Sequence, residues 1–375
     1  MRRLNDEAGA AAVFVAFLLV LLLGLGALVL DVGNSYWERR QLQNGADAGA
    51  LAVALDLAND IIDQDASPSA GDLAEPYTGT AKAYADANAA DGVSDIESLE
   101  LDPVDGLPLT QAGEVTATTL VNDAGENTLS HWLAPFLGFD NTVINAPASA
   151  IYGAVGAVGG AFPVTICEDV INDAGTNTLV EIEIKIGPPG QAEDVETSCQ
   201  TSDSWDGPSP GNFNWLDTDG SSCTADLEIG EEIEGDSDPG ANLPNECQGE
   251  EADIRSAIES FPGAGSDQYD ENRELRTRYL AIFSTIGGPG QDTYTISGLA
   301  AFEFTGINLR PGNQQAVITD PSYSHAGWIN PECGLPQSRC VQGFFRSEVI
   351  KPWEIDEFEI VPGAPSDLLG VKLTR

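Results

Sequence analysis

The feature that most constrains this chain is an uncharged run of 23 residues near its N-terminus, from Ala8 to Leu30. At about 1.5 Å rise per residue, a helix of this length spans the roughly 30 Å hydrocarbon core of a bilayer. The apolar core of a signal peptide is usually only about 7–15 residues long, and no clear small-x-small cleavage site follows Leu30. The run therefore predicts a retained single-pass membrane helix, with a cleaved signal peptide as the alternative.

The helical pattern continues beyond this run without a break. Apolar residues recur at intervals of four, four, three and four, at Leu42, Ala46, Ala50, Val53 and Leu57. Gly45 and Gly49 lie four residues apart beside this stripe, and each costs up to about 1 kcal/mol relative to alanine inside a helix. Close approach of another helix is the usual reason for such glycines. The alternative is a tolerated pair of glycines in an alanine-rich helix.

The stripe supplies the predicted helix-packing residues, which are Leu42, Gly45, Ala46, Gly49 and Val53. The stripe could dock on the chain's own unit over residues 76–154 or on helices of partner proteins. For the part nearest the membrane, residues 31–50, we expect docking on partner helices, because these residues emerge before any folded unit of the chain could cover them. Asn59, Asp60 and the following DQDASPSAGD end the helix. The sequence therefore predicts one long helix that lies half in the membrane and half outside.

Charge limits what the chain can bind. Asp and Glu number 60 and Lys and Arg number 16, so the formal net charge is −44. Such a surface repels nucleic acid and anionic lipid headgroups. The composition therefore predicts no nucleic-acid partner, and it suits a strongly solvated exterior domain.

All six cysteines lie beyond residue 160, at Cys167, Cys199, Cys223, Cys247, Cys333 and Cys340. An even number of cysteines in acidic loops rich in Gly and Pro is typical of disulfides in an oxidising compartment. A zinc site would need close pairs such as C-x-x-C, which this sequence lacks. All six are therefore disulfide candidates, and Cys333 and Cys340, which flank GLPQSR, are predicted to pair with each other.

The cysteines also indicate the orientation in the membrane. Basic residues do not decide it, because Arg2 and Arg3 precede the apolar run while Arg39 and Arg40 follow it. Disulfides in the C-terminal part require an oxidising compartment for that part. The predicted localisation is the cell membrane, with a single pass, a cytoplasmic N-terminus and an exterior C-terminal domain.

A small α+β unit is predicted after the long helix. Its expected parts are a helix over 76–91, a strand over 113–121, a short amphipathic helix over 128–139 and a strand over 141–153. The composition of GAVGAVGGA, residues 153–161, is typical of a linker. Further strands are predicted over 162–170, 178–187, 278–288, 292–307, 314–319 and 340–350.

The first sixty residues carry a family resemblance. Its motifs are the early arginine pair, Glu7 with Gly9, the apolar span, then DVG, Tyr36, RR, LQ and ADAGALA at 46–52. With this layout the region resembles the N-terminal region of the TadE/TadG-like Flp (tight-adherence) pilus-assembly proteins. LSHWLAPFLGFDNTVINAPASA, residues 129–150, looks like the short helix and strand that close this region in the family. GNFNWLD, followed by Cys223, is similar to TadG-related proteins that have a cysteine-rich C-terminal part.

One departure bears on what the resemblance implies. Processed pilins carry Glu five residues after the cleavage-site glycine, and counted from Gly9 this position is Phe14. A carboxylate inside a membrane is expensive, so its presence in pilins is functional and its absence here is informative. The resemblance therefore implies a membrane-resident, TadG-like assembly component that works with other Tad/Flp pilus-assembly proteins or pilins, rather than a major pilin.

The expected fold class is α+β. Residues 1–30 form the N-terminal tail and transmembrane helix, and residues 31–154 form a pilin-like extended helix with the small α+β unit. Residues 155–375 form an acidic, mostly β, disulfide-containing exterior domain. The expected function is a non-enzymatic structural or assembly role in the bilayer, with an anchored surface adhesin or ligand-binding module as the alternative and an anchored hydrolase as a third possibility.

Three short motifs partly match the patterns of metal-binding or catalytic sites. Asp217–Glu228 has acids at positions one, three and twelve of an EF-hand loop, but its glycine and Cys223 are misplaced for calcium. Asp320–Ser324 fits the D-x-S-x-S pattern of von Willebrand A-type metal sites, although too few residues follow for that fold. Ser130–His131 reads as a helix cap or a surface pair. We therefore expect no catalytic residue, metal or cofactor.

Overall fold

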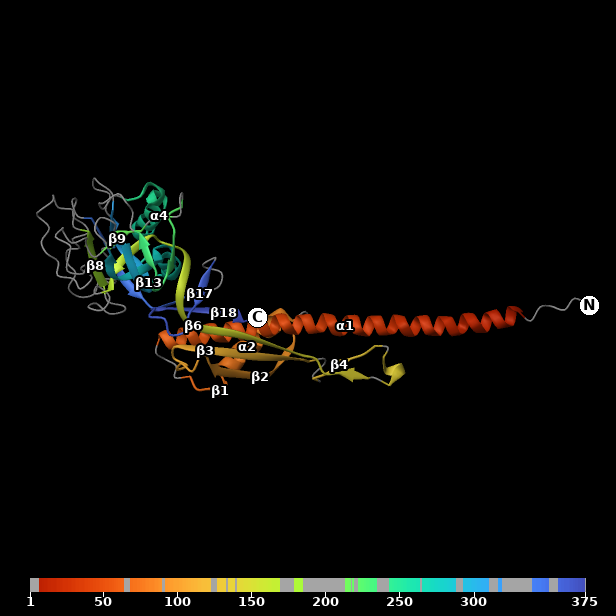
Figure 1. Cartoon of the computed structure of the whole chain (residues 1–375). Helices are drawn as coiled ribbons and strands as arrows, with labels where there is room; N and C mark the ends of the chain where they lie inside the picture. The colour runs from red at the N-terminus through yellow and green to blue at the C-terminus, as the bar shows by residue number, and fades with distance from the viewer. Residues whose placement is uncertain are drawn as a thin grey trace, which may run out of the picture.

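The structure is a computed structural model, and it describes most of the chain. The described residues are 7–63, 68–89, 92–122, 127–132, 134–138, 140–168, 179–184, 213–216, 218, 222–234, 243–263, 265–287, 293–309, 316–318, 339–350 and 357–374. They form two eight-stranded sheets, one two-stranded hairpin and one very long N-terminal helix. The helix projects from the folded part as a single rod (Figure 1).

The long helix α1 runs from Glu7 to Ile62 and contains 56 residues. Its first part is apolar, and its most apolar stretch is not buried by any other part of the described chain. It is long and apolar enough to cross a membrane. The prediction of one helix that continues beyond the apolar run is confirmed. We call residues 8–30 the apolar half of α1 and residues 31–62 its outer half.

The first sheet packs against the outer half of α1. Its strands follow the spatial order β1-β2-β3-β6-β18-β16, and β10 and β17 also pair with β6. Helix α2, Tyr77–Asn88, lies beside α1 and over β2. The strands are β1 Gly71–Asp72, β2 Ser94–Pro103, β3 Ala112–Val121, β6 Asn145–Ala161, β10 Ala225–Glu228, β16 Glu348–Ile350, β17 Phe358–Ile360 and β18 Leu368–Thr374.

A core of small residues fills the space between α1, α2 and this sheet. We call it the N-terminal core. Many of its buried members are alanines, which let helix and sheet lie close together: Ala46, Ala50, Ala54, Ala58, Ala81, Ala117, Ala148 and Ala150. Larger side chains such as Leu57, Leu101 and Tyr152 fill the remaining volume.

Strand β6 extends through the segment predicted to be a linker, and that prediction is wrong. Its first half pairs with β3 on one side and β18 on the other, and its second half pairs with β10 and β17. A β-carbon on Gly156 would overlap the side chain of Val361. Small residues are thus required by close neighbours rather than by a flexible connection.

The same strand joins the two parts that were predicted to divide at residues 154 and 155. β6 passes through this point without interruption and bends toward the second sheet (Figure 1). β18 then returns to the first sheet, where Thr374 lies opposite Ser149. Along the chain, β6 precedes the strands of the second sheet and β18 follows them. The first sheet is therefore linked to the second sheet both before and after it in the sequence.

The second sheet has the order β8-β15-β13-β12-β7-β9, and β11 and β14 also pair with β13. Its pairs are antiparallel except for β7 and β12. The elements are β7 Val164–Cys167, β8 Leu179–Ile184, β9 Phe213–Trp215, β11 Glu232–Glu234, α4 Gln248–Glu259, α5 Tyr269–Leu275, β12 Thr277–Gly287, β13 Thr293–Asn308, β14 Ala316–Val317 and β15 Arg339–Arg346. The short helix η2, Asn245–Cys247, leads directly into α4.

Aromatic side chains dominate the core of the second sheet, which we call the C-terminal core. Phe302 packs edge to face with Phe304 and Phe345, with ring centroids 4.9 and 5.1 Å apart. Phe162 makes the same kind of contact with Trp215 at 5.6 Å. Such pairs stabilise a core beyond their buried area.

Most predicted elements are present. The predicted helix 76–91 corresponds to α2, the predicted strand 113–121 to β3, and all six strand segments after residue 161 contain strands. Helices α4 and α5 were not predicted. The predicted helix over 128–139 is wrong: this region is the hairpin of β4, Leu129–Ser130, and β5, Asn141–Thr142, with the short 3-10 helix η1, Ala134–Leu137, between them.

Candidate functional site

The predicted helix-packing stripe faces the chain's own second helix. A β-carbon on Gly45 would lie 3.3 Å from the carbonyl oxygen of Ala85, and one on Gly49 would lie 3.1 Å from that of Ala81. Both alanines are fully buried. The glycines therefore allow α2 to approach α1 closely.

This contact corrects the expectation that the stripe docks on helices of partner proteins. Leu42, Ala46 and Val53 are at most 2% exposed within the chain itself. The expectation is wrong from about residue 42 onward, because α2 and the first sheet fold back along the helix and cover it there. Residues 32–41 are mostly exposed or half-buried.

Polar contacts hold the other side of the outer half to the sheet. The buried hydroxyl of Thr119 on β3 donates to the carbonyl oxygen of Leu42 at 2.8 Å. The amide Nε2 of Gln43 donates to the carbonyl oxygen of Pro147 on β6 at 3.1 Å. The Thr119 bond fixes the position of α1 along the strands, because a buried hydroxyl needs a specific partner. The Gln43 bond is exposed and adds a second contact.

The far end of the outer half is tied to the start of α2. The Tyr77 hydroxyl donates to Asp60 at 2.7 Å, and the Thr80 hydroxyl donates to Asp56 at 2.9 Å. Burial, together with the hydrogen bond and negative charge of Asp60, raises the pKa of Tyr77 to about 12. The phenol therefore remains a donor throughout the ordinary pH range.

Asp31 ties the near end of the outer half to the hairpin. It is the first acidic residue after the apolar run, and it is only 6% exposed. Its carboxylate accepts hydrogen bonds from the backbone N–H groups of Trp132, at 3.0 Å, and Ala134, at 2.6 Å. In the sequence, Asp31 stood out only as part of the family resemblance. Its position directly after an apolar span could have predicted that this carboxylate needs hydrogen-bond partners.

The hairpin is also held at its base. Leu129 and Ile144 pack with Leu42 of α1 in a small buried cluster. Within the hairpin, Nε2 of His131 lies 2.8 Å from the hydroxyl of Thr142. Ser130–His131 is thus part of a hairpin rather than a helix cap.

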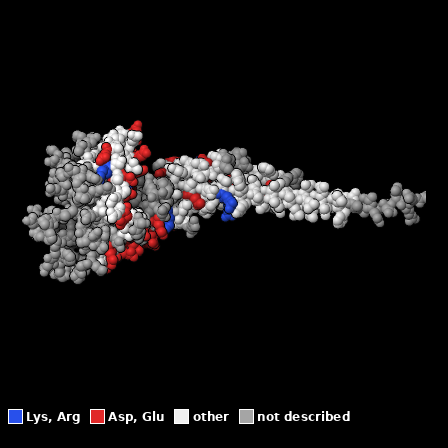
Figure 2. All heavy atoms as spheres, turned by 90° about the horizontal axis from the view of Figure 1, so that it is seen from above, with Lys and Arg blue, Asp and Glu red and all other residues white. Residues whose placement is uncertain are grey.

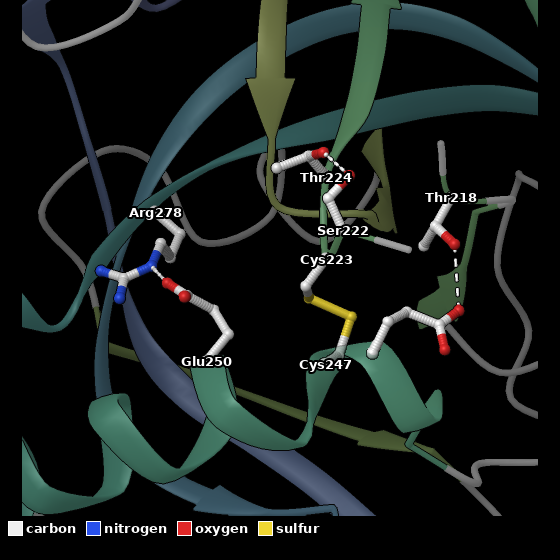
Figure 3. Close-up of a disulfide and its surroundings, with 8 residues drawn as sticks. Thr218, Ser222, Cys223, Thr224, Cys247, Glu250 and Arg278 are labelled. Carbon is white, nitrogen blue, oxygen red and sulfur yellow. Dashed lines mark hydrogen bonds and ion pairs between the residues drawn. A yellow bond between two sulfur atoms is a disulfide. The ribbon is translucent and has the colours of Figure 1, made fainter. Parts of the chain in front are cut away.

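A disulfide between Cys223 and Cys247, 24 residues apart, packs against the C-terminal core (Figure 3). It joins the segment before β10 to the start of α4. Close to it, Nε of Arg278 on β12 lies 2.5 Å from the Glu250 carboxylate of α4. Cys167 at the end of β7 is also disulfide-bonded. Cys199 and Cys333 lie outside the described residues, so the predicted pairing of Cys333 with Cys340 stays a prediction.

A network of buried ion pairs adjoins the C-terminal core. Glu303 on β13 is fully buried. One of its carboxylate oxygens forms an ion pair with a guanidinium nitrogen of Arg276 at 2.7 Å, and the other forms one with Arg346 at 2.6 Å. Arg276 is also fully buried and donates to Asn272 and to the carbonyl oxygen of Phe304. Every charge in this network has close partners, as buried ions require.

The motifs weighed as metal sites gain no support from the described residues. The second half of the calcium-like motif is strand β10, paired with β6, rather than a loop. Asp320–Ser324 lies outside the described residues. Among the described residues, no group of three or more His, Cys, Asp or Glu side chains is placed to hold a metal ion.

A cavity of about 600 Å³ lies where the two sheets meet. Its lining includes Gln111, Glu168, Ser297 and Asp367. Burial raises the pKa of Asp367 above its usual range. The cavity therefore combines open space with a carboxyl group for which the charged form is unfavourable.

Acidic side chains gather on the folded part of the molecule, whereas the projecting helix is almost free of charge (Figure 2). This separation follows the sequence, in which the apolar half contains no charged residue. It divides the molecule into an apolar rod and an acidic, strongly hydrated body.

Comparisons with known proteins bear on the helix alone. No curated protein and no solved structure matches the chain. The family model Tad, which describes Flp pilus-assembly TadE/G-like proteins, matches residues 9–56. This stretch contains nearly all of the apolar half, Asp31 and the glycines that contact α2. The resemblance of the N-terminal region is thereby confirmed, and over residues 9–56 the chain carries the TadE/G-like region of the Flp pilus-assembly proteins. The resemblances of residues 129–150 and of GNFNWLD stay predictions.

Proposed function

We propose that this chain is a single-pass membrane protein and a TadG-like component of Flp/Tad pilus assembly, with a structural or assembly role rather than an enzymatic one. The observation that carries the proposal is the division of α1. Its apolar half is unburied, its outer half is built into the folded part, and the family match over residues 9–56 covers most of both. The helix is thus a rigid connection between a bilayer and an acidic body.

The orientation is part of the proposal. The N-terminus lies in the cytoplasm and the folded part lies outside. The disulfides at Cys167 and at Cys223–Cys247 support this orientation, because such bonds persist in oxidising compartments.

The structure also bears on how partners are contacted. From about residue 42 onward the outer half is covered by α2 and the first sheet, so this part offers little surface to another helix. In the apolar half, by contrast, Gly24 and Gly26 have nothing within 4 Å of the position of a β-carbon. Helices of other Tad/Flp proteins or pilins would therefore pack on the apolar half within the membrane, where small residues favour close approach. Phe14 at the position of the pilin glutamate favours an assembly factor over a filament subunit.

A helix exchange tests this role. Residues 9–30 are replaced by an unrelated transmembrane helix of equal length, and the control variant carries Gly33→Leu. We expect the exchanged chain to remain in the membrane fraction with its exterior part open to protease in cells stripped of any outer barrier. We also expect it to lose co-purification with pilus-assembly proteins and to lose surface pili. Full protection of residues 41–375 would overturn the orientation, and unchanged partner recovery and piliation would overturn the assembly role.

The cavity where the two sheets meet supports a second candidate, a surface adhesin or ligand-binding module. Its volume of about 600 Å³ lies within the range of small-molecule sites. Saturable binding of a glycan to the purified full chain, lost on Ser297→Trp at the cavity wall, would favour this function. Absence of binding in a glycan array, together with loss of pili in the helix exchange, would leave the assembly role.

A further inference from the structure

The hairpin of β4, η1 and β5 extends along α1 toward the N-terminus and away from the first sheet (Figure 1). Its base packs on Leu42 through Leu129 and Ile144, and its tip is bonded to Asp31. Between Leu42 and Asp31 the helix rises about 16 Å, at about 1.5 Å per residue. The hairpin therefore carries part of the folded body back to the level at which the apolar half ends.

The tip of the hairpin, residues 132–138, has a composition typical of segments at a membrane–water interface. Trp132 is 77% exposed at this level, although tryptophan is normally well buried in folded proteins. Residues 132–139 read WLAPFLGF and contain no charged side chain. His131 and Asp140 form the next rung back from the tip, joined by a backbone hydrogen bond. The polar side chains thus lie behind the tryptophan.

The helix presents matching aromatic residues. Tyr36 and Trp37 are 62% and 48% exposed, and they follow Asp31 by five and six residues. This corresponds to about 8–9 Å along the axis, close to the depth of one headgroup layer of a bilayer. Trp and Tyr prefer this layer because their rings are apolar and their N–H and O–H groups are polar. Trp132 adds a third aromatic side chain, from a different part of the chain.

From these positions we propose that the hairpin tip is a second membrane contact, in which Trp132 enters the headgroup layer of the leaflet from which α1 emerges. Asp31 is the positioning residue that holds the tip there. This inference rests on the proposed function, in which the apolar half spans a bilayer. The net charge of −44 keeps the rest of the body away from an anionic lipid surface, and the uncharged tip is the part that can approach it.

A second membrane contact, added to the membrane helix, would restrict the orientation of the folded part. A single helix leaves the body free to rotate about the helix axis and to tilt with it. A contact displaced from this axis fixes one rotational setting of the acidic body above the membrane. The hairpin tip would thus orient the body as well as support it.

The experiment measures tryptophan quenching in the full chain reconstituted in phosphatidylcholine vesicles that contain headgroup-labelled nitroxide lipid. No other protein is present, so quenching reports lipid contact only. The chain has six tryptophans, and the difference between the wild type and Trp132→Phe isolates the signal of Trp132. Trp37→Phe isolates the signal of the helix in the same way. We expect Trp132→Phe to remove about half of the quenchable emission, since two indoles would share the interface.

A variant of the positioning residue completes the test. Asp31→Ala should reduce the quenching of Trp132 at least twofold while that of Trp37 and the far-ultraviolet circular dichroism stay unchanged. Asp47→Ala is the matched control on the same helix, because the Asp47 carboxylate is bonded to Gln43 of α1 itself. Quenching of Trp37 without Trp132 would overturn the hairpin contact and leave the membrane anchor intact. Quenching of neither residue would overturn the placement of α1 in the membrane.

Discussion

The N-terminal and C-terminal cores reach stability by opposite means. The N-terminal core is built largely from alanines and glycines at a helix–helix contact, where the carbonyl oxygen of Ala81 lies 3.1 Å from the β-carbon position of Gly49. The C-terminal core is built from large aromatic rings, a disulfide and a buried ion network. One core gains from close backbone approach, the other from large buried side chains and crosslinks.

The difference has a mechanical consequence. A core that includes α1 transmits any movement of the apolar half of this helix directly to the first sheet, because the helix is itself part of that core. The C-terminal core contains no residue of α1. Perturbing each core separately should therefore show whether the two regions unfold together or apart, and the following predictions run from the largest expected effect to the smallest.

Glu303→Gln should destabilise the C-terminal core most strongly. The substitution keeps the shape of the side chain but leaves Arg276 buried without its counter-charge, which typically costs about 3–5 kcal/mol. Urea unfolding followed by tryptophan emission measures the loss. Asp95→Asn is the control in the other region, because the Lys82–Asp95 pair is half exposed and such pairs contribute at most about 1 kcal/mol. Equal losses in both variants would contradict the prediction.

Removing the disulfide with Cys223→Ser and Cys247→Ser should cost about 3 kcal/mol, the loop-entropy value for a closure of this length. The loss should appear in the unfolding of the second sheet and leave the protection of α2 against protease unchanged. Limited proteolysis with mass spectrometry resolves the two regions. Cleavage within α2 at the same denaturant concentration as cleavage within α4 would show that the two cores unfold as one unit.

Gly49→Leu should destabilise the N-terminal core by about 1–3 kcal/mol, because the added side chain meets the backbone of α2 and forces the helices apart. Leucine is the better helix former, so a loss cannot come from helix propensity. Gly33→Leu on the same helix is the matched control, since nothing lies within 4 Å of its β-carbon position. Thermal unfolding by circular dichroism compares the two variants, and equal melting temperatures would exclude the close packing inferred here.

Substitution of two carboxyl groups should give the smallest changes in the free energy of unfolding, and the two changes should have opposite signs. Burial raises the folded-state pKa of Asp367 above the ordinary 3.8, so its charged form disfavours folding at neutral pH. Asp367→Asn should then raise the melting temperature at pH 7, and the gain should vanish as pH falls below 3.8 and both states become protonated. Ser297→Ala, at another point of the cavity wall, is the control, because it changes no ionisable group.

Asp86 on α2 supplies the converse case. Burial acts to raise its pKa, but hydrogen bonds from Ser94 and Lys82 outweigh burial and hold it below 3.8. The charged form therefore stabilises the fold above the ordinary pKa, and this contribution is lost as pH falls through the lowered value. Asp86→Asn should lower the melting temperature at pH 7 and approach the wild type in acid. Melting temperatures measured from pH 7 to pH 3 test both signs.

The sequence predicted those features that depend on local pattern. An apolar run of 23 residues and a continuing stripe at helical spacing are enough to define α1. Alternating residues likewise indicated β3, β12 and β13. The close approach at Gly45 and Gly49 was foreseen as a possibility, but the identity of the approaching helix was not, because α2 is polar enough to read as a surface helix.

Features that depend on distant partners could not be predicted. The small residues of β6 suit a linker as well as a strand, and only its pairing with β18, far along the chain, decides between them. Trp132 and Phe136 have helical spacing, yet the conformation of their segment is tied to Asp31, about a hundred residues earlier. The partner of Cys223 was open among five other cysteines until the fold brought Cys247 beside it.

The return of β18 to β6 sets an order of events during biosynthesis. Thr374 bonds to the carbonyl oxygen of Ser149, 225 residues earlier, so β6 leaves the ribosome long before the strand that completes its edge. Until then this edge exposes unpaired backbone groups, which is the condition under which nascent β proteins aggregate or recruit chaperones. A chain truncated before residue 368 would never close the sheet. The fold thus makes completion of the first sheet depend on synthesis of the whole second sheet, and it gives proteases a structural feature by which unfinished chains differ from finished ones.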